Sequence, residues 1–499
     1  MASRKEQLNA HGFARRRVVA AFLHPGAAGS DDGAPRPLHA LLPGAVLGAV
    51  LLAASGAWGL MRPSAPTGWD TPGKHVIVAD ESTTRYVVLN DSRTHEPVLH
   101  PVLNMASARL LLDPGGYDVI KVRESALDHS GIEHGAPLGI PYAPDRLPRP
   151  ADAAEAKVWA VCDRPDGGSG RTVRQAVFVL GRDEAADVGG PSLLTGDQVL
   201  YVQDEQARQY LVDAGGTRFR LGRAGPAGRA KGGGDADLLP RTLFGEDPRP
   251  QTVTDDWLGS LTSGTPVDFP AVEGRGTLVR VGGVPSGHAT VGTVLRATSA
   301  AGEEYYVVTR RGAAPVTRFA ALLLLQANAQ TDPVRSSLPP APQPAFLPAD
   351  WPRGDPHQVN ATTGESPREV VCVVLHGTSV APSAPRLRMW TGREYPERVV
   401  EGTTSAYVTP GSGLLYQEVS GSDTSGGTRY LVTDTGLRYA VPRTGTGGGP
   451  ADASRPTDEV ATRLGYADVN PLPIPIGWSE LLPRGPVLDT GSAARPQGS

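Results

Sequence analysis

An uncharged apolar stretch near the N-terminus places the strongest constraint on what this chain can form. Residues 38–61 read LHALLPGAVLGAVLLAASGAWGLM and contain no Asp, Glu, Lys or Arg. As a helix, this stretch would span about 35 Å, enough for a hydrocarbon core of about 30 Å. A cleaved signal peptide is the alternative, but the run is longer than the apolar core of a typical signal sequence. We therefore expect a single uncleaved transmembrane helix at 38–61.

The charges on either side of this stretch predict its orientation. Residues 1–37 include Arg4, Lys5, the cluster at 15–17 and Arg36, whereas Arg62 is the only cation close behind the stretch. The positive-inside rule therefore predicts a basic cytoplasmic tail at 1–37 and an extracytoplasmic location for the rest, in the periplasm-like space outside an inner membrane. Residues 3–23 could form an amphipathic helix that docks on lipid or on a partner, or could remain a solvated charged tail.

Length and composition narrow the classes of protein further. A chain of 499 residues is too long for one compact core, so several substructures are expected. The net charge of -4 opposes a nucleic-acid partner. The 61 glycines and 47 prolines favour short strands joined by turns over long helices.

A strand-and-turn motif recurs four times beyond the apolar stretch. Each copy begins with a tyrosine in a period-two strand, and the tyrosines are Tyr86, Tyr210, Tyr306 and Tyr430. The first and third are 220 residues apart, as are the second and fourth, and the unrelated pair Trp257 and Trp478 is 221 apart. Because independent motifs share this offset, we predict an internal duplication. Gly215, Gly312 and Gly436 lie in three of the turns, where we expect positive φ angles.

An apolar segment with helical spacing follows each hairpin, at 102–112, 236–245, 319–328 and 458–466. The predicted unit is therefore β-β-α, which must pack on a neighbour to bury its apolar face. We expect an α+β, strand-rich, elongated domain with four repeats around a central β body and a pseudo-twofold duplication. The predicted divisions are repeat 1 at 62–125, a first segment of the central body at 126–200, repeat 2 at 201–270, repeat 3 at 271–335, a second segment of the central body at 336–418, repeat 4 at 419–488 and a disordered tail at 489–499. The proline-rich run 331–356 is expected to be an extended linker.

The chain has two cysteines, Cys162 and Cys372, which fall at corresponding places in the two halves. They have no neighbours that would complete a four-ligand metal site. Two buried thiols are one interpretation. In an exported domain a disulfide across the pseudo-twofold axis is the other.

No segment predicts a catalytic, cofactor or metal site. Residues 68–75, GWDTPGKH, approach the phosphate-binding pattern G-x-x-x-x-G-K-[ST], but His75 replaces the final hydroxyl residue. His129 and His134 are five residues apart, which does not place them on one helical face, and we expect no metal there. We also find no nucleophile elbow.

Several stretches resemble the EccB family, a membrane component of actinobacterial type VII (ESX) secretion systems. They occur in the family's order and extend over most of the chain: RKEQLNAHGFARRR from Arg4, HPVLNMASARLL from His100, GIPYAPDRLP from Gly139, WAVCD from Trp159, YLVTDTGLRYAVP from Tyr430 and LGYADVNPLPIPIGWSELLPRGPVLD from Leu464.

This resemblance implies a structural subunit of the inner-membrane translocation complex, together with EccC (the motor ATPase), EccD and EccE. It also implies four repeats around a central body and a disulfide, which carries over to Cys162 and Cys372. We further expect the extracytoplasmic domain to associate with its own copies. Some family members are labelled ATPases. This sequence supports that activity poorly, because His75 replaces the hydroxyl residue of the phosphate-binding pattern. An envelope-facing nucleotide hydrolase and a cell-wall-binding module remain the alternatives.

Overall fold

The computed structural model describes most of the chain and separates it into two compact units, residues 1–66 and 67–499. The described residues are 4–23, 38–61, 65–114, 117–166, 172–222, 238–285, 287–300, 302–340, 346–361, 367–376, 386–399, 404–421, 427–443 and 458–497.

The first unit contains two helices, α1 (Arg4–Leu23) and α2 (Leu38–Met61). No residue of α1 is buried, and Leu8, Val19 and Phe22 are exposed. The backbone of α2 is helical over its whole length, and its side chains are described over residues 43–56. Within the described part of the chain, no helix combines the length and hydropathy that crossing a membrane requires.

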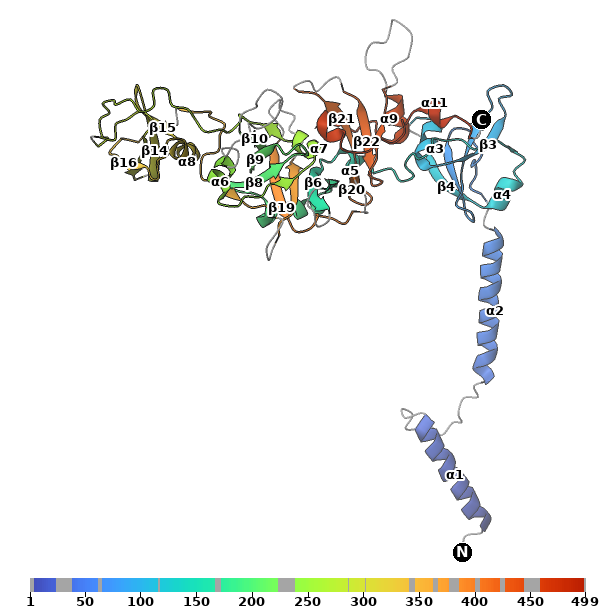
Figure 1. The fold of residues 1–499 in the computed structure, drawn as a ribbon. Helices are drawn as coiled ribbons and strands as arrows, with labels where there is room; N and C mark the ends of the chain where they lie inside the picture. The colour runs from blue at the N-terminus through green and yellow to red at the C-terminus, as the bar shows by residue number, and fades with distance from the viewer. Residues whose placement is uncertain are drawn as a thin grey trace. The chain divides into compact units, whose positions relative to one another are not determined.

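The second unit contains five described β-sheets (Figure 1). Sheet 1 comprises β1 (His75–Ala79), β2 (Arg85–Asn90), β3 (Pro97–Val102), β4 (Asp118–Val122) and β5 (Glu133–His134). Sheet 2 comprises β8 (Gln198–Gln203), β9 (Gln209–Asp213), β10 (Thr217–Arg220), β11 (Gln251–Thr252), β12 (Thr262–Ser263) and β17 (His357–Gln358). Sheet 3 comprises β13 (Val294–Ser299), β14 (Gly302–Thr309), β15 (Gly312–Val316) and β16 (Val334–Arg335). Sheet 4 comprises β21 (Gly413–Val419), β22 (Arg429–Thr433), β23 (Arg438–Ala440) and β24 (Leu472–Pro475). The central sheet comprises β6 (Val158–Asp166), β7 (Thr172–Leu180), β18 (Val370–Leu375), β19 (Leu387–Gly392) and β20 (Thr404–Val408).

Sheets 1 to 4 share one strand order. In each, three consecutive strands pair antiparallel, a helix follows, and a fourth strand returns parallel to the first on its free edge. The helices are α3 (Met105–Leu111), α6 (Leu238–Phe244), α8 (Arg318–Ala327) and α9 (Glu459–Leu464). Further short helices are α4 (Glu124–Asp128), α5 (Pro150–Ala154), η1 (Glu184–Val188), η2 (Gly190–Ser192), α7 (Asp255–Gly259), α10 (Ile476–Ser479) and α11 (Thr490–Ala493).

The hairpin and the helix of the predicted β-β-α unit are present in each of these sheets, but the prediction did not include the first and fourth strands. The first strand carries no tyrosine motif, so sequence periodicity did not distinguish it from the preceding segment. For this reason β8 and β21 begin inside the ranges 126–200 and 336–418 that we assigned to the central body. Positive φ angles occur at Gly312 and Gly436 as expected, but in the second hairpin at Gly216 rather than Gly215.

Helices connect sheets 1 and 3, which we call the outer sheets, to sheets 4 and 2, which we call the inner sheets. On one side α3 of sheet 1 packs on α9 of sheet 4, and the Arg109 side chain donates to the Leu464 carbonyl at 3.0 Å. On the other side α8 of sheet 3 packs on α6 of sheet 2 through Phe319, Leu323, Leu239 and Leu243. Each outer sheet thus shares an apolar core with one inner sheet.

The C-terminal segment corrects the prediction of a disordered tail at 489–499. Asp489 caps α11, Ala493 is buried, and Gln497 donates its backbone N–H to the Pro137 carbonyl at 2.9 Å. Only residues 498 and 499 of that range lie outside the described residues. A short segment that reads as polar is ordered because it adds its few apolar side chains to an existing core.

The expected linker at 331–356 is also wrong in part. Val334 and Arg335 form β16, and Trp351 is buried with its indole N–H donating to the Thr265 carbonyl at 3.2 Å. Its prolines suggested an extended spacer, but the segment contributes a strand to sheet 3 and an aromatic side chain to the core beside α8.

Two glycines that share the 221-residue offset occupy crowded positions. A Cβ atom on Gly264 would lie 2.5 Å from the Phe219 ring, and a Cβ on Gly485 would lie 2.5 Å from the Tyr439 ring. Both rings are buried, so they cannot move aside. The third strand of each inner sheet therefore carries an aromatic ring that packs closely against a glycine.

We predict that Gly485→Ala destabilises the second unit by about 1–3 kcal/mol, because the added methyl overlaps the buried Tyr439 ring. Urea unfolding followed by tryptophan fluorescence measures this change. Gly477→Ala is the matched control, since a Cβ there meets nothing within 4 Å. Equal stability of the two variants would contradict the packing described.

Candidate functional site

The central sheet is where the two halves of the chain meet. Its strand order is β19-β18-β6-β7-β20, so the strands from the first half, β6 and β7, lie between strands from the second half. The antiparallel pair β6–β18 sets Cys162 directly opposite Cys372, with their Cα atoms 4.1 Å apart. Antiparallel strands have a local twofold axis at such a pair, so equivalent residues of the halves meet there.

Cys162 and Cys372 form a disulfide in this structure. Both side chains are fully buried in a cluster that includes Phe178, Val374 and Trp390. The bond closes a loop with a sequence separation of 210 residues. In the chain-entropy account, a crosslink over a loop of this length stabilises the folded state by about 5 kcal/mol.

We predict that protein isolated from the cell envelope contains this crosslink, and non-reducing peptide mass spectrometry would identify it. Cys162→Ala combined with Cys372→Ala should lower the melting temperature by many degrees, because the unfolded chain gains freedom while the cavity formed is small. Treating the double variant with reductant is the control and should change nothing. Free thiols in the isolated wild-type protein would contradict the pairing.

The opposite face of the central sheet carries both inner sheets. Trp159 and Val161 of β6 and Val371 and Val373 of β18 point to this face. They form one core with β8 and β9 of sheet 2, with β21 and β22 of sheet 4, and with Trp257 and Trp478 from α7 and α10. The Trp257 indole N–H donates to the Val371 carbonyl at 3.0 Å. One continuous core therefore fixes sheets 2 and 4 on the central sheet.

A buried carboxylate lies at the contact between the central sheet and α7. Asp163 of β6 accepts hydrogen bonds from the backbone N–H and hydroxyl of Thr254, the N-cap of α7, at 2.6 and 2.9 Å. Its second oxygen, Oδ1, is buried without a hydrogen-bond partner. Burial raises the pKa of Asp163 to about 7, and the nearby Asp256 carboxylate adds to the shift. Motif analysis did not single out this residue, because the strand reads as uniformly apolar up to it.

Asp163 should make the second unit less stable as pH rises. Below about pH 4 the carboxyl is protonated in both the folded and the unfolded protein. Between about pH 4 and 7 only the folded protein retains the proton. The free energy of unfolding should therefore fall by up to about 1.4 kcal/mol per pH unit over this range. Asp163→Asn should remove this decline in urea unfolding measured from pH 4 to 8. Asp166→Asn on the same strand, half exposed, is the control. A slope unchanged in Asp163→Asn would contradict the assignment.

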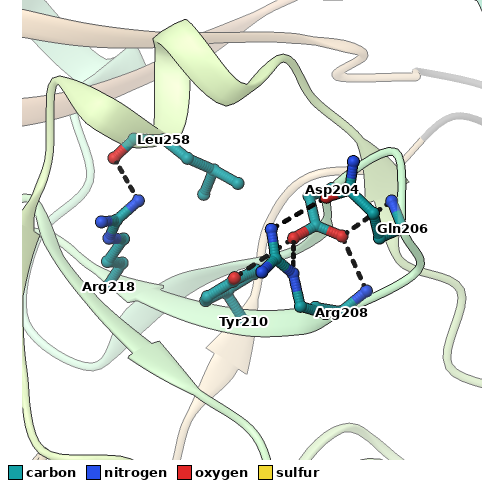
Figure 2. A network of polar contacts seen from close by, with 6 residues as sticks. All are labelled: Asp204, Gln206, Arg208, Tyr210, Arg218 and Leu258. Carbon is teal, nitrogen blue, oxygen red and sulfur yellow. Dashed lines mark hydrogen bonds and ion pairs between the residues drawn. The ribbon is translucent and has the colours of Figure 1, made fainter. Parts of the chain in front are cut away.

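A second buried acid, Asp204, belongs to sheet 2, and Figure 2 shows its surroundings. Asp204 in the β8–β9 turn accepts from the backbone N–H groups of Gln206 and Arg208, from the Arg208 guanidinium and, at 3.2 Å, from the Tyr210 hydroxyl. In the same figure the Arg218 side chain of β10 donates to the Leu258 carbonyl of α7 at 2.7 Å. These contacts hold the turn and join the third strand to α7.

Sheet 4 has a corresponding network in which the acid and the arginine meet. Tyr416 pairs with Tyr430 across the strands, and Glu418 lies two residues after it. In sheet 2 Val202 pairs with Tyr210 in the same way, and Asp204 lies two residues after it. Arg438, 220 residues after Arg218, donates to Glu418 at 2.6 Å and to the Ser479 hydroxyl of α10 at 2.7 Å. The spacing of the two arginines was a signal that the sequence contained, although motif analysis did not use it.

The segment that approaches a phosphate-binding pattern has a different geometry. Residues 67–74 form turns that lead into β1, and no helix follows, whereas a phosphate-binding loop leads into a helix N-terminus. The backbone N–H of Gly73 donates to the Val88 carbonyl at 2.9 Å, so it is not free for a phosphate. A Cβ on Gly73 would also contact the Asp113 carboxylate.

The two histidines at 129 and 134 do not form a ligand pair in this structure. His129 bonds through Nδ1 to the Ser125 carbonyl at 2.7 Å, and His134 of β5 lies edge-on to the Tyr86 ring. Among the residues described, no group of three His, Cys, Asp or Glu side chains is placed to hold a metal ion. The geometry provides a body that is joined by a disulfide and one continuous apolar core and that contains buried polar networks.

Comparisons with known sequences place this body in a family. The family model described as type VII secretion system ESX-1, transport TM domain B, matches residues 1–498. The ESX-3 secretion system ATPase EccB3 of Mycobacterium tuberculosis (strain H37Rv) is 26% identical over 525 residues, covering 98% of this chain and 88% of that protein. The ESX-1 secretion system ATPase EccB1 of the same strain is 24% identical over 516 residues, covering 98% and 94%.

Solved structures share the fold. One chain in an intact ESX-5 inner membrane complex matches with a TM-score of 0.60 and 22% identity, covering 100% of this chain and 96% of that one. A chain of an EccB3 dimer from the ESX-3 core complex matches with a TM-score of 0.60 and 21% identity, covering 84% and 99%. Because the family model extends over nearly every residue, this chain belongs to the EccB family of type VII secretion system components.

Proposed function

We propose that this protein acts as a structural scaffold in the inner-membrane complex of a type VII secretion system. The observation that carries this function is the fused architecture of its second unit. Both halves contribute strands to one sheet, a disulfide joins them, and one continuous core holds sheets 2 and 4. Such a body can hold partner proteins at fixed positions without moving itself, which is what a translocation complex requires of a non-motor subunit.

We further propose that residues 38–61 are the single membrane anchor, with 1–37 in the cytoplasm and the remainder outside the inner membrane. The uncharged sequence of α2 and the excess of arginine before it support this topology. A disulfide in the second unit suits an oxidising compartment. The basic helix α1 would then be available to other subunits or to anionic lipid on the cytoplasmic side.

Sheets 1 to 4, each with its helix, are proposed to be four copies of one ancestral unit. Their common strand order, the offset of 220 residues and the paired crowded glycines support this origin. In this division, sheets 1 and 2 belong to the first half and sheets 3 and 4 to the second. The predicted divisions then need one change, since repeats 2 and 4 should begin at β8 and β21.

The partners we propose are subunits of the EccC, EccD and EccE type, together with further copies of this chain. Support comes from relatives with the same fold, one within an ESX-5 inner membrane complex and one described as a dimer from an ESX-3 core complex. The motor activity is assigned to EccC. The net charge of -4 opposes binding to nucleic acid, so we propose no nucleic-acid partner.

Two other functions remain alternatives. The relatives' names include the word ATPase, which favours a nucleotide hydrolase that faces the envelope. The geometry of residues 67–74 does not favour it, because the Gly73 N–H is already bonded within the fold. A cell-wall-binding module, the other alternative, would be detected by a pull-down on peptidoglycan.

Purification of the tagged full-length protein in mild detergent tests the scaffold. We expect EccC- and EccD-type subunits to be recovered with it, because a scaffold contacts several partners at once. An unrelated single-pass membrane protein carrying the same tag is the control. Recovery of the protein alone as a monomer would contradict the proposal.

An ATP hydrolysis assay on the same preparation distinguishes the scaffold function from the hydrolase alternative. Purified protein should release no phosphate from ATP above the background of Lys74→Ala, since Lys74 is the residue that a phosphate-binding loop would require. Turnover that Lys74→Ala abolishes would replace the scaffold with an enzyme.

A further inference from the structure

Tyr142 combines an exposed aromatic ring with a left-handed backbone. Its side chain is 87% exposed, and its φ angle is 62°. Ile140, two residues before it, and Ala143, directly after it, are buried in the core shared by sheets 1 and 4. A bulky residue in this conformation costs about 1–2 kcal/mol, which glycine would avoid. The fold therefore bears a cost to present a ring that its own core does not use.

The loop that carries Tyr142 is held firmly on both sides. The Ile140 backbone N–H donates to the Ser107 hydroxyl at 2.8 Å, and its carbonyl accepts from the Asn104 side chain at 2.8 Å. Beyond Tyr142, the Asp145 carboxylate accepts from the Met105 N–H at 3.1 Å and pairs with Arg85 at 2.5 Å. The backbone segment that carries the exposed ring is therefore held on both sides.

The other half of the chain has an aromatic ring at the corresponding place, and there the ring is buried. The Pro144 carbonyl accepts from Ala106 at the start of α3, and the Arg353 carbonyl accepts from Phe319 at the start of α8. Tyr142 and Trp351 each lie two residues before that acceptor. Trp351 is only 7% exposed, because it packs edge-on against Phe319 with ring centroids 5.9 Å apart.

Two differences explain why Tyr142 is not buried in the same way. Ala106 stands where the second half has Phe319, so α3 offers no ring for Tyr142 to pack on. The C-terminal segment occupies the neighbouring space, with the Gln497 side chain donating to the Gly139 carbonyl at 2.7 Å and Pro496 bridging to Leu138. Both halves keep an aromatic residue, but only one half has a pocket for it.

We propose that Tyr142 is an anchor of the contact between two copies of this chain, and that Leu103 belongs to the same contact. Leu103 is partly exposed and lies against the backbone at Gly139. This inference rests on the self-association included in the proposed function. Tyrosine is among the residues enriched at the energetic centres of protein interfaces, because it supplies apolar area and one polar group.

The charges beside Tyr142 favour a second copy over an unrelated partner. A twofold contact brings the same patch of both subunits together, so it must be complementary to itself. Asp145 and Arg146 are adjacent and of opposite sign. Within the chain Asp145 pairs with Arg85 and Arg146 lies 3.6 Å from Asp434, but their side chains remain 55% and 71% exposed. Arg146 of one copy can therefore face the exposed part of Asp145 of the other, around a central pair of rings. Such a polar rim around an apolar centre is typical of stable interfaces.

Photo-crosslinking in the full-length protein tests which molecule covers this residue. Two differently tagged copies are co-expressed, one of them carrying Tyr142→benzoylphenylalanine, and are purified in mild detergent after irradiation. We expect a crosslinked species that carries both tags. A crosslink to any other subunit or to lipid, or no crosslink at position 142, would overturn the inference.

Variants at the same position measure how much the ring contributes. Tyr142→Ala and Tyr142→Gly should weaken self-association roughly tenfold or more, as truncation of an interface anchor does, whereas Tyr142→Phe should retain most of it. Tyr142→Gly should fold at least as well as the wild type, because glycine fits the left-handed backbone. The control is Leu278→Ala, which removes another exposed apolar side chain, on a segment next to sheet 3.

These outcomes are distinguishable from those of the proposed function. Self-association unchanged in Tyr142→Ala and Tyr142→Gly would overturn the anchor while recovery of other secretion subunits still supports the scaffold. A wild-type protein that is monomeric and recovers no partner would overturn the scaffold itself, and the anchor with it. A weakened dimer with unchanged melting temperature supports the inference.

Discussion

The antiparallel pairing of β6 with β18 is the interaction on which the second unit depends. It places Cys162 opposite Cys372 and so fixes the register of the two halves of the chain. A shift of β18 by one residue would turn Cys372 toward the face that carries Trp159 and would move Val371 and Val373 away from it, which would break the core of sheets 2 and 4. The disulfide and the apolar pattern therefore specify the same register: the apolar pattern opposes a shift of one residue, and the disulfide also excludes a shift of two residues, which would keep the faces unchanged.

From this central sheet outward, the molecule uses the same kind of contact in both directions. The inner sheets pack by their inner faces on the central sheet, and by their outer faces on the helices of the outer sheets. Polar groups hold the two short tryptophan helices in place. Buried Asp163 of the central sheet and half-buried Arg218 of sheet 2 bond to α7, and buried Arg438 of sheet 4 bonds to α10. Because a buried polar group without a hydrogen bond costs free energy, these hydrogen bonds favour one orientation at each joint.

The two halves differ in ways that matter for function. Arg438 and Glu418 form a buried ion pair, whereas Asp204 is satisfied within its own turn and Arg218 bonds to a carbonyl. Trp351 is buried at one junction, while Tyr142 is exposed at the other. In the duplication that we propose, the two halves provide equivalent frameworks, and differences of this kind would let one of them face a partner.

Much of this organisation could be predicted from the residues alone. The uncharged stretch at 38–61, the hairpins with their tyrosines and the helices after them rest on local periodicity, which each segment carries by itself. The common offset of the tyrosines and tryptophans predicted that distant segments are related. Tertiary structure alone decided the rest: the first strand of each sheet, the order at the C-terminus, and the buried partners of Asp163 and Glu418. Those features depend on which distant segment lies alongside, and a side chain's burial and charge environment exist only once that neighbour is in place.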